Sequence, residues 1–88
     1  MFTKEDILEY THELSANFAQ RDKTTYLDCE AAFIWLMNER KDLIENSLTT
    51  GEITEEQFDE IDSVFDKLAA ELQILAIKAR DKFNKGGK

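Results

Sequence analysis

The sequence predicts an all-α fold of three helices, in which a long antiparallel helical hairpin packs with a shorter N-terminal helix and assembles as an oligomer. The chain has 88 residues with no proline and only three glycines, so little interrupts helical structure. Apolar residues recur every three or four positions in three successive segments. Hydrophobic residues make up 42% of the chain, which is enough for one core. We expect a single domain over residues 1–84 and a flexible tail over residues 85–88.

The first helix is predicted to begin after Thr3, an N-cap residue whose capping-box partner is Asp6, three positions on. An apolar stripe with spacings of four, three and four then indicates an amphipathic helix of about four turns. The stripe consists of Ile7, Thr11, Leu14 and Phe18, and Leu8 widens it. Residues 20–23 break the pattern, so we expect the helix to end there.

The second helix is predicted to run from near Thr24 to about Asn46, and it is apolar on nearly every side. A helix that is apolar all round must be covered on all sides, and a short chain has few elements to cover it. The apolar positions are Leu27, Phe33, Ile34, Trp35, Leu36, Met37, Leu43 and Ile44. This helix therefore predicts burial against other copies of the chain.

The third helix follows a short connection in which Gly51 suits a turn, and the capping box of Thr54 and Gln57 opens it. Its apolar residues keep a 3.5-residue period over three heptads, at Phe58, Ile61, Phe65, Leu68, Leu72, Leu75 and Ala79. Ile74 and Ile77 fall outside this seam and form a second apolar surface. We predict an oligomer interface formed by Phe33, Trp35, Met37, Ile74 and Ile77.

Charge and composition exclude several classes of protein. A net charge of −8 argues against general DNA binding, which depends on neutralising phosphates. Cys29 is the only cysteine, so one chain forms neither a disulfide nor a cysteine-based zinc site. No segment has the apolar length of a membrane span, and the first residues do not resemble a secretory signal. We expect a cytoplasmic protein with no membrane partner.

The charges are unevenly distributed along the third helix. Residues 52–66 contain seven acids and no base, whereas residues 78–88 contain five bases and only one acid. Acids at the start of a helix and bases at its end complement the helix dipole, which accounts for most of this pattern. The acidic stretch also suits an alternative function, in which the protein inhibits a host enzyme by presenting residues 52–66 to a basic site on that enzyme.

Acidic pairs supply the best enzymatic alternative. Carboxylates at i and i+3 can converge on a hard cation, as in the all-α nucleotide pyrophosphohydrolases that hold magnesium. The chain has two such pairs, and Glu9 with His12 matches the Glu-x-x-His element of di-iron bundles. A chain with 19 acids forms such pairs by chance, and an exposed helix face is their usual role. The two acidic pairs are Glu39–Asp42 and Glu56–Asp59. We expect no catalytic residue, no metal and no cofactor.

The entry to the second helix is the best candidate for ligand binding. Arg21 and Lys23 stand just before the predicted helix start, and a helix N-terminus with its free amide donors suits phosphate. Thr24 and Thr25 add hydroxyl donors. On pattern alone these are ordinary loop residues, so the phosphate-binding interpretation needs further support.

Tyr10 and His12 complete the candidate site if the first helix packs antiparallel to the second. They would then face a subunit surface within reach of the entry of another chain. An aromatic ring there could stack on a nucleobase, an interaction worth about 1–3 kcal/mol per base. The alternative is a residue at the rim of the core for Tyr10 and a solvated surface residue for His12.

The stretch from Arg21 to Trp35 resembles the core motif of the small phage proteins that counter CBASS immunity. In that family an Arg-acid-basic entry precedes a Ser/Thr-containing turn and a Leu-x-x-Glu-Ala-like helix that carries a tryptophan. The matching residues here are Arg21-Asp22-Lys23, Thr24, Thr25, Leu27, Glu30-Ala31-Ala32 and Trp35. The chain lacks the proline that relatives carry before this entry, which leaves the geometry of the entry open.

The resemblance implies a hexameric sponge that binds cyclic di- and trinucleotides, of the cyclic GMP–AMP type, without cleaving them. In the family, the dinucleotide pockets lie between protomers and use a lysine from this entry and a tyrosine from the first helix. Lys23 matches that lysine by its place in the motif, and Tyr10 is the natural tyrosine. The implied partners are cyclic oligonucleotides and other copies of the chain, in the cytoplasm of the infected bacterial host.

Overall fold

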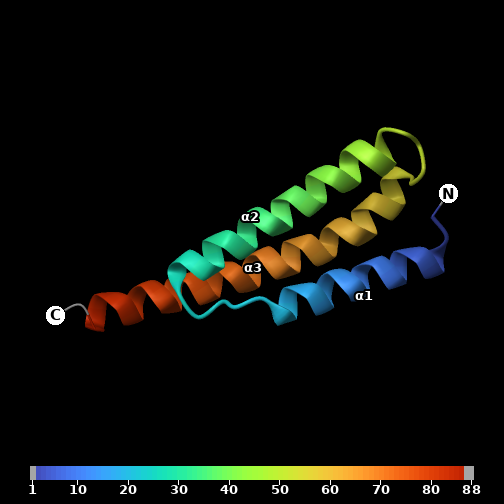
Figure 1. Cartoon of the computed structure of the whole chain (residues 1–88). Coiled ribbons are helices and arrows are strands. Elements are labelled where there is room, and N and C mark those ends of the chain that lie inside the picture. Colours follow the sequence, from blue (N-terminus) through green and yellow to red (C-terminus); the bar gives the residue numbers. More distant parts are fainter. Residues whose placement is uncertain (1, 87–88) are drawn as a thin grey trace.

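The computed structural model describes the backbone of residues 2–86 and the side chains of residues 2–82 (Figure 1). It contains the α-helices α1 (Lys4–Gln20), α2 (Tyr26–Leu43) and α3 (Glu55–Gly86), with a short π-helical segment η1 (Ile44–Leu48) after α2. Residues 2–86 contain no strand. The predicted all-α fold of three helices is therefore confirmed.

Capping boxes open α1 and α3, as the sequence predicts. The backbone N–H of Asp6 donates to Thr3 Oγ1 over 3.2 Å, and the N–H of Thr3 donates to Asp6 Oδ2 over 2.9 Å. At α3 the N–H of Gln57 donates to Thr54 Oγ1 over 3.2 Å, and the N–H of Thr54 donates to Gln57 Oε1 over 2.9 Å. Each box satisfies donors that have no partner within the helix.

The second helix begins at Tyr26, because Thr25 is its N-cap. Thr25 and Asp28 form a third capping box, in which the N–H of Asp28 donates to Thr25 Oγ1 over 3.1 Å and the N–H of Thr25 donates to Asp28 Oδ2 over 3.2 Å. At its other end, regular α-helix stops at Leu43 and the chain continues through η1. The predicted end near Asn46 therefore lies inside the π-helical segment.

Gly51 makes the sharp turn between η1 and α3. Its φ of +81° lies in the left-handed region, where a side chain is strained, so the expected role of Gly51 in this turn is confirmed. The carbonyl of the buried Ser47 accepts the N–H of Glu52 over 2.8 Å and that of Ile53 over 3.3 Å. These bonds fold the connection back so that Ile53 enters the core.

The helices α1 and α3 start at the same end of the molecule, and α2 runs in the opposite direction (Figure 1). At that end the N–H of Phe2 donates to the carbonyl of Glu52 over 3.1 Å, and Gln57 Nε2 donates to the carbonyl of Phe2 over 2.9 Å. Midway along the molecule, Arg40 Nε lies 2.6 Å from Asp62 Oδ1 and joins α2 to α3. These bonds tie the segment before α1 to the start of α3, and α2 to the first half of α3.

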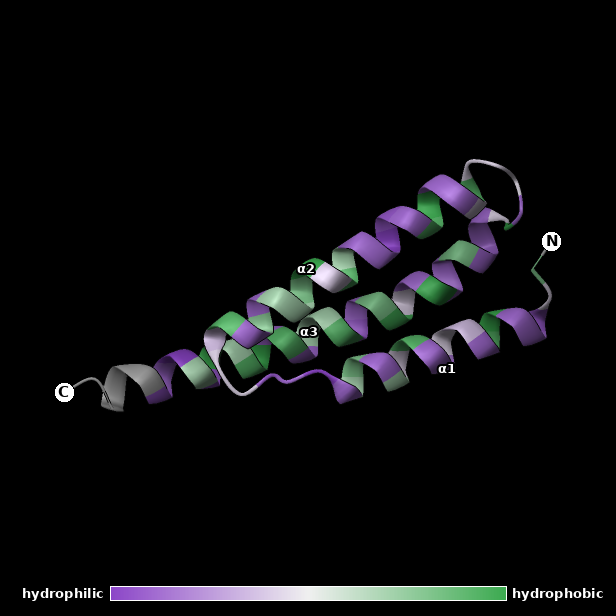
Figure 2. Cartoon of the chain, in the orientation of Figure 1, coloured by the Kyte–Doolittle hydropathy of each residue, from purple (hydrophilic) through white to green (hydrophobic). Residues whose placement is uncertain are grey.

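One apolar core runs along α3, which contributes its 3.5-period seam. Leu36 of α2 meets Ile61 and Phe65 of α3 at the centre, and all three are almost fully buried. In Figure 2 the hydrophobic residues gather where the first half of α2 lies along α3, and hydrophilic residues cover the outer side of α1. The other buried apolar residues are Ile7, Leu14, Phe18, Cys29, Ala32, Leu43, Ile53, Phe58, Leu68 and Leu72.

The molecule is elongated because α3 is much longer than the helices that cover it. Its extents are 54 × 20 × 16 Å, and its radius of gyration is 15.3 Å, against about 12 Å for a compact chain of this length. The last turns of α3 extend beyond the start of α2 (Figure 1). The helix continues to Gly86, two residues past the domain boundary predicted at residue 84. The rest of the predicted tail, residues 87–88, lies outside the described residues.

Candidate functional site

Arg21 is the first residue after α1, and its side chain lies on α2. Its N–H donates to the carbonyl of Phe18 over 3.2 Å, which closes the last turn of α1. Its guanidinium carbon lies 4.4 Å from the centroid of the Trp35 ring, within the range of a cation–π contact. Arg21 is exposed and Trp35 is half-buried. The entry therefore carries a guanidinium that is supported by an aromatic plane and open to solvent.

Lys23 is turned back onto the end of α1. Its ammonium donates to the carbonyl of Phe18 and, over 3.1 Å, to the carbonyl of Arg21, and it lies 4.3 Å from the centroid of the Phe18 ring. A cation at this place adds a second donor to the carbonyl of Phe18, which also accepts the N–H of Arg21, and complements the dipole of α1. Two of the three ammonium donors are thus engaged within the chain. This structural role was not foreseen from the sequence.

The hydroxyl of Thr24 and the start of α2 are held by two carboxylates. Thr24 Oγ1 lies 2.9 Å from Asp22 Oδ1 and 3.3 Å from Asp28 Oδ2, and its N–H donates to Asp22 Oδ1 over 3.1 Å. Thr25 is the N-cap and bonds to Asp28 in the capping box. The Thr24 hydroxyl and the N–H groups of Thr24 and Thr25 are therefore engaged by Asp22 and Asp28, and the Thr25 hydroxyl accepts the N–H of Asp28. A phosphate at this helix end would meet two negative charges, so the entry is best approached from the side of Arg21.

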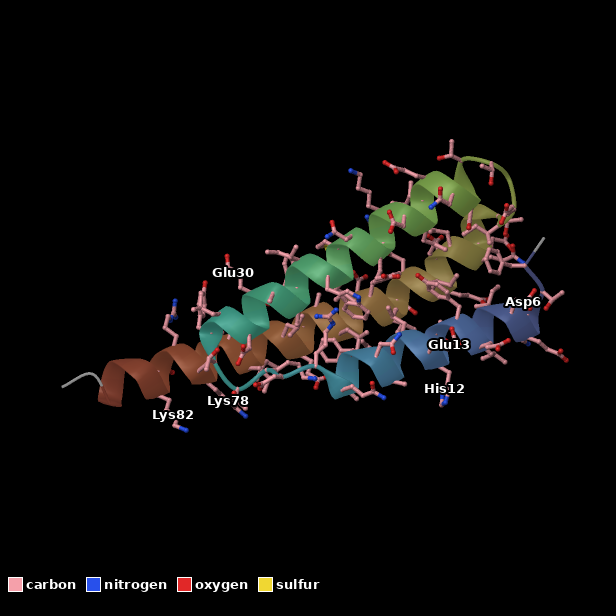
Figure 3. The ribbon with its side chains drawn as sticks, in the orientation of Figure 1. Asp6, His12, Glu13, Glu30, Lys78 and Lys82 are labelled. Carbon is pink, nitrogen blue, oxygen red and sulfur yellow. The ribbon has the colours of Figure 1, made fainter. Side chains whose placement is uncertain are left out.

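Tyr10 lies far from the entry within one chain. It precedes Arg21 by eleven residues of α1, which is about 16 Å along the helix axis. It is half-buried, and its burial, followed by the negative charges of Glu39 and Asp42, raises the pKa of Tyr10 to about 12. His12 is exposed and points away from the other two helices (Figure 3). Only another copy of the chain could bring these side chains to the entry.

A groove of about 580 Å³ lies between the first half of α2 and the middle of α3. Its floor includes the buried Cys29 and Leu72, and the exposed aromatic rings of Tyr26 and Phe33 line it. Burial raises the pKa of the Cys29 thiol, which donates to the carbonyl of Lys23 over 3.4 Å. The volume is typical of small-molecule sites. The other lining residues are Glu30, Asp66, Ala69, Ala70, Gln73 and Ala76.

Sequence reasoning missed this groove. The available signal was the group of alanines near the middle of α3, of which positions 69, 70 and 76 line the groove, in a helix that otherwise buries large side chains. Small residues on one helix leave room beside a neighbouring helix with large side chains, but whether a groove forms depends on which residues face each other. That pairing follows from the register between α2 and α3, which periodicity alone does not determine.

The five residues of the predicted oligomer interface fall into two groups. Phe33, Ile74 and Ile77 are 44%, 56% and 45% exposed, so they are available to a partner. Trp35 and Met37 are half-buried and pack against the core of their own chain. Large apolar side chains with such exposure are costly to leave in water. Further exposed apolar residues are Leu8, Tyr26, Leu27 and Ile34.

The candidate metal ligands do not meet in one chain. Among the described residues, no three histidine, cysteine, aspartate or glutamate side chains lie close enough to hold a metal ion. Glu39 and Asp42 lie near Tyr10, whose pKa they raise. Glu9 and His12 are both exposed on α1, and the other acidic pair, Glu56 and Asp59, is exposed near the start of α3.

Comparison of the chain with protein-family models, with curated proteins and with solved structures finds no match. In the described part of the chain, no helix combines the length and the apolar character that crossing a membrane requires. What the protein does must therefore be inferred from its own residues, above all from the entry at residues 21–25, the neighbouring groove and the exposed apolar side chains.

Proposed function

We propose that this protein is a phage anti-defence protein that binds cyclic di- and trinucleotide second messengers and sequesters them without cleaving them. The resemblance of residues 21–35 to the anti-CBASS sponges supports this proposal. The protein would act in the cytoplasm of the infected bacterium, where sequestration prevents the second messenger from reaching its effector. Sequestration works by mass action, so tight binding matters and turnover does not.

The single observation that carries the proposal is the guanidinium of Arg21 on the Trp35 ring, 4.4 Å from its centroid. An arginine fork matches the oxygens of a phosphate, and an aromatic support reduces the side-chain freedom that binding must remove. The ion pairs of the described residues, Arg40–Asp62 and Lys41–Glu45, do not include Arg21. Its charge is therefore available to an anionic ligand.

A homohexamer is the proposed form of the protein, with the α2–α3 hairpin and α1 as its protomer. Exposed apolar side chains on α2 and α3, among them Phe33, Ile74 and Ile77, support this assembly. A neighbouring copy would add Tyr10 and His12 to the entry and would enclose a ligand between chains. Nanomolar affinity corresponds to about 12 kcal/mol, and such a value requires a ligand that is largely enclosed.

Binding of 3′,3′-cyclic GMP–AMP tests the proposal directly. Pure protein is incubated with this cyclic dinucleotide, separated from free ligand, denatured and analysed by chromatography, and we expect intact ligand in the protein fraction. Titration calorimetry should show that Arg21→Ala weakens binding about ten- to a hundredfold, because a charged hydrogen bond is worth about 1.5–3 kcal/mol. Lys67→Ala removes an exposed cation elsewhere on α3 and should bind like wild type.

The outcomes of this experiment separate the alternatives. Equal binding by Arg21→Ala and wild type would show that the pocket lies elsewhere. Cleaved nucleotide in the protein fraction would favour the magnesium-dependent hydrolase. A wild-type protein that binds no cyclic oligonucleotide would overturn the sponge proposal.

A second candidate is an acidic protein that inhibits a host enzyme. Residues 52–66 contain seven acids and no base, and of these acids only Asp62 forms an ion pair among the described residues, with Arg40. The exposed carboxylates give the first half of α3 a negative surface that complements a basic site. Inhibition of a basic host enzyme that weakens steeply with salt, in the absence of nucleotide binding, would favour this function.

A further inference from the structure

A second stripe of residues runs along α3, separate from its buried seam. It consists of positions spaced by four, three, four and three residues, so they share one helix face with a 3.5-residue period. All five are exposed, and three of them line the groove beside α2. The stripe is Asp66, Ala70, Gln73, Ile77 and Arg80. Its uncharged centre consists of Ala70, Gln73 and Ile77, and Asp66 and Arg80 carry opposite charges at its two ends.

The two charges of the stripe do not neutralise each other within one chain. Asp66 and Arg80 are separated by fourteen residues of the same helix, which is about 21 Å along its axis. Neither takes part in the ion pairs of the described residues. Each lies seven residues from Gln73, on opposite sides of it. A second copy of α3, reversed about Gln73, would therefore bring each charge opposite its counterpart.

We propose that two copies of the chain associate through this face, with their α3 helices antiparallel and a two-fold axis at Gln73. The contact between Asp66 and Arg80 of the partner subunit then forms twice, as the symmetry of such an interface requires. Ile77 enters the groove of the other copy, where Ala69 and Ala70 leave room and Phe33 forms the wall. The inference rests on the self-association in the proposed function and not on nucleotide binding.

Other arrangements of the same helices fit less well. A parallel pair in register would set Asp66 against Asp66 and Arg80 against Arg80, and like charges across an interface disfavour association. An antiparallel pair centred on Ala70 would set Ile77 against the exposed Ser63, outside the groove. Of these, only the arrangement centred on Gln73 matches the charges and also buries Ile77 between alanines.

Charge reversal with rescue tests this arrangement. The oligomeric mass of wild type, Asp66→Arg, Arg80→Asp and the double variant is measured by light scattering after gel filtration at micromolar concentration. Each single variant sets like charges together twice, so we expect a smaller particle and at least a tenfold weaker association. The double variant restores the pairs in reverse and should regain the wild-type mass. Circular dichroism checks that all variants remain helical, since both residues are exposed.

Lys78→Asp is the matched control. Lys78 stands between Ile77 and Arg80 in sequence, but its side chain points away from α2, on the far side of α3 (Figure 3). This variant should keep the wild-type mass. If wild type assembles and the single reversals do not change its mass, or if the double variant is not rescued, the inference fails while the proposed function stands. A monomeric wild type would overturn both the inference and the proposed assembly, and titration with cyclic dinucleotide would still report on binding.

Discussion

Arg21 and Lys23 are two cations of the same short connection, yet their side chains lie in different environments. The ammonium of Lys23 is bound to carbonyls at the end of α1 and packs on the ring of Phe18. The guanidinium of Arg21 instead rests on Trp35 and remains exposed. Substitution of Arg21 therefore tests ligand binding with little effect on α1. Substitution of Lys23 affects α1 and any phosphate contact at the same time.

Tyr10 should make the stability of the protein depend on pH in the alkaline range. Burial, with Glu39 and Asp42, raises the pKa of this phenol from 10.0 to about 12 in the folded state. A raised folded-state pKa favours the neutral phenol, so its contribution to stability is complete below pH 10 and is lost as the pH rises toward 12. We expect the free energy of unfolding to fall by about 1–2 kcal/mol more in wild type than in Tyr10→Phe.

Urea titrations at several pH values, from 9 up to about 12, measure this difference. The series ends there because the pKa of Tyr10 in the folded protein is about 12. Tyr10→Phe is a matched control because it keeps the ring and removes only the ionisable hydroxyl. All other ionisable groups are the same in both proteins, so the difference between the two stability curves reports on Tyr10. Parallel stability curves would show that Tyr10 ionises as easily in the folded protein as in the unfolded chain.

At the scale of the helices, what the sequence predicts depends on how local the signal is. The boxes at Thr3 and Thr54 join residues three positions apart, and both are predicted and confirmed. The sequence predicts the start of α2 near Thr24, one residue before the N-cap Thr25, because two adjacent threonines offer the same capping chemistry. The π-helical segment after Leu43 was not predicted. It lies where the chain leaves α2 for the turn at Gly51 and brings Ile53 into the core, so it depends on contacts between helices and not on a local pattern.

The candidate site shows the same division between local and tertiary signals. The position of Arg21 and Lys23 next to a helix start follows from the sequence, and the structure places them there. Which of these two side chains points outward depends on the contact of Lys23 with Phe18 and of Arg21 with Trp35. The contact with Trp35 joins the connection to α2 and is not a local signal. The groove depends on the register of α2 against α3. No periodic pattern in a single helix reports such a register.

The junction between α1 and α2 should lose stability when Lys23 is replaced. Lys23→Ala removes the hydrogen bonds from the ammonium to the carbonyls of Phe18 and Arg21, and also its contact with the Phe18 ring. Hydrogen bonds of a charged group contribute about 1.5–3 kcal/mol, and partial exposure of Lys23 reduces the loss to about 1–2 kcal/mol. Urea denaturation followed by circular dichroism measures the change.

Two further variants make the Lys23 experiment specific. Lys67→Ala removes an exposed lysine that makes no hydrogen bond or ion pair among the described residues, and it should change stability by less than about 0.5 kcal/mol. Lys23→Arg keeps a cation near the end of α1 and should recover part of the loss. A Lys23→Ala protein as stable as Lys67→Ala would show that the ammonium does not stabilise α1.

The whole molecule is a rod with separated charge. Its longest extent is 54 Å, and the first half of α3 carries the acids while the end that extends past α2 carries bases. The buried part of α3 ends at Leu72, and Ala76 and Ala79 are half-buried beyond it. The projecting end therefore contributes little to the core of its own chain. Its exposed Ile77 and Arg80 are instead suited to contact another copy.

Shortening α3 should separate assembly from folding. A chain that ends after Ala79 keeps the buried core but loses Arg80, so we expect a change in stability below about 1 kcal/mol and a loss of assembly. A chain that ends after Asn84 keeps Arg80 and should assemble like the full chain.

The two shortened chains have almost the same net charge. The chain that ends after Ala79 lacks four bases and one acid, so its net charge changes from −8 to −11, and the chain that ends after Asn84 lacks two bases, so its net charge is −10. Light scattering after gel filtration measures the mass, and urea denaturation measures the stability. Since the two shortened chains are almost equally acidic, general charge repulsion would disrupt both, whereas the contact of Arg80 with Asp66 of the partner subunit predicts disruption of the first alone.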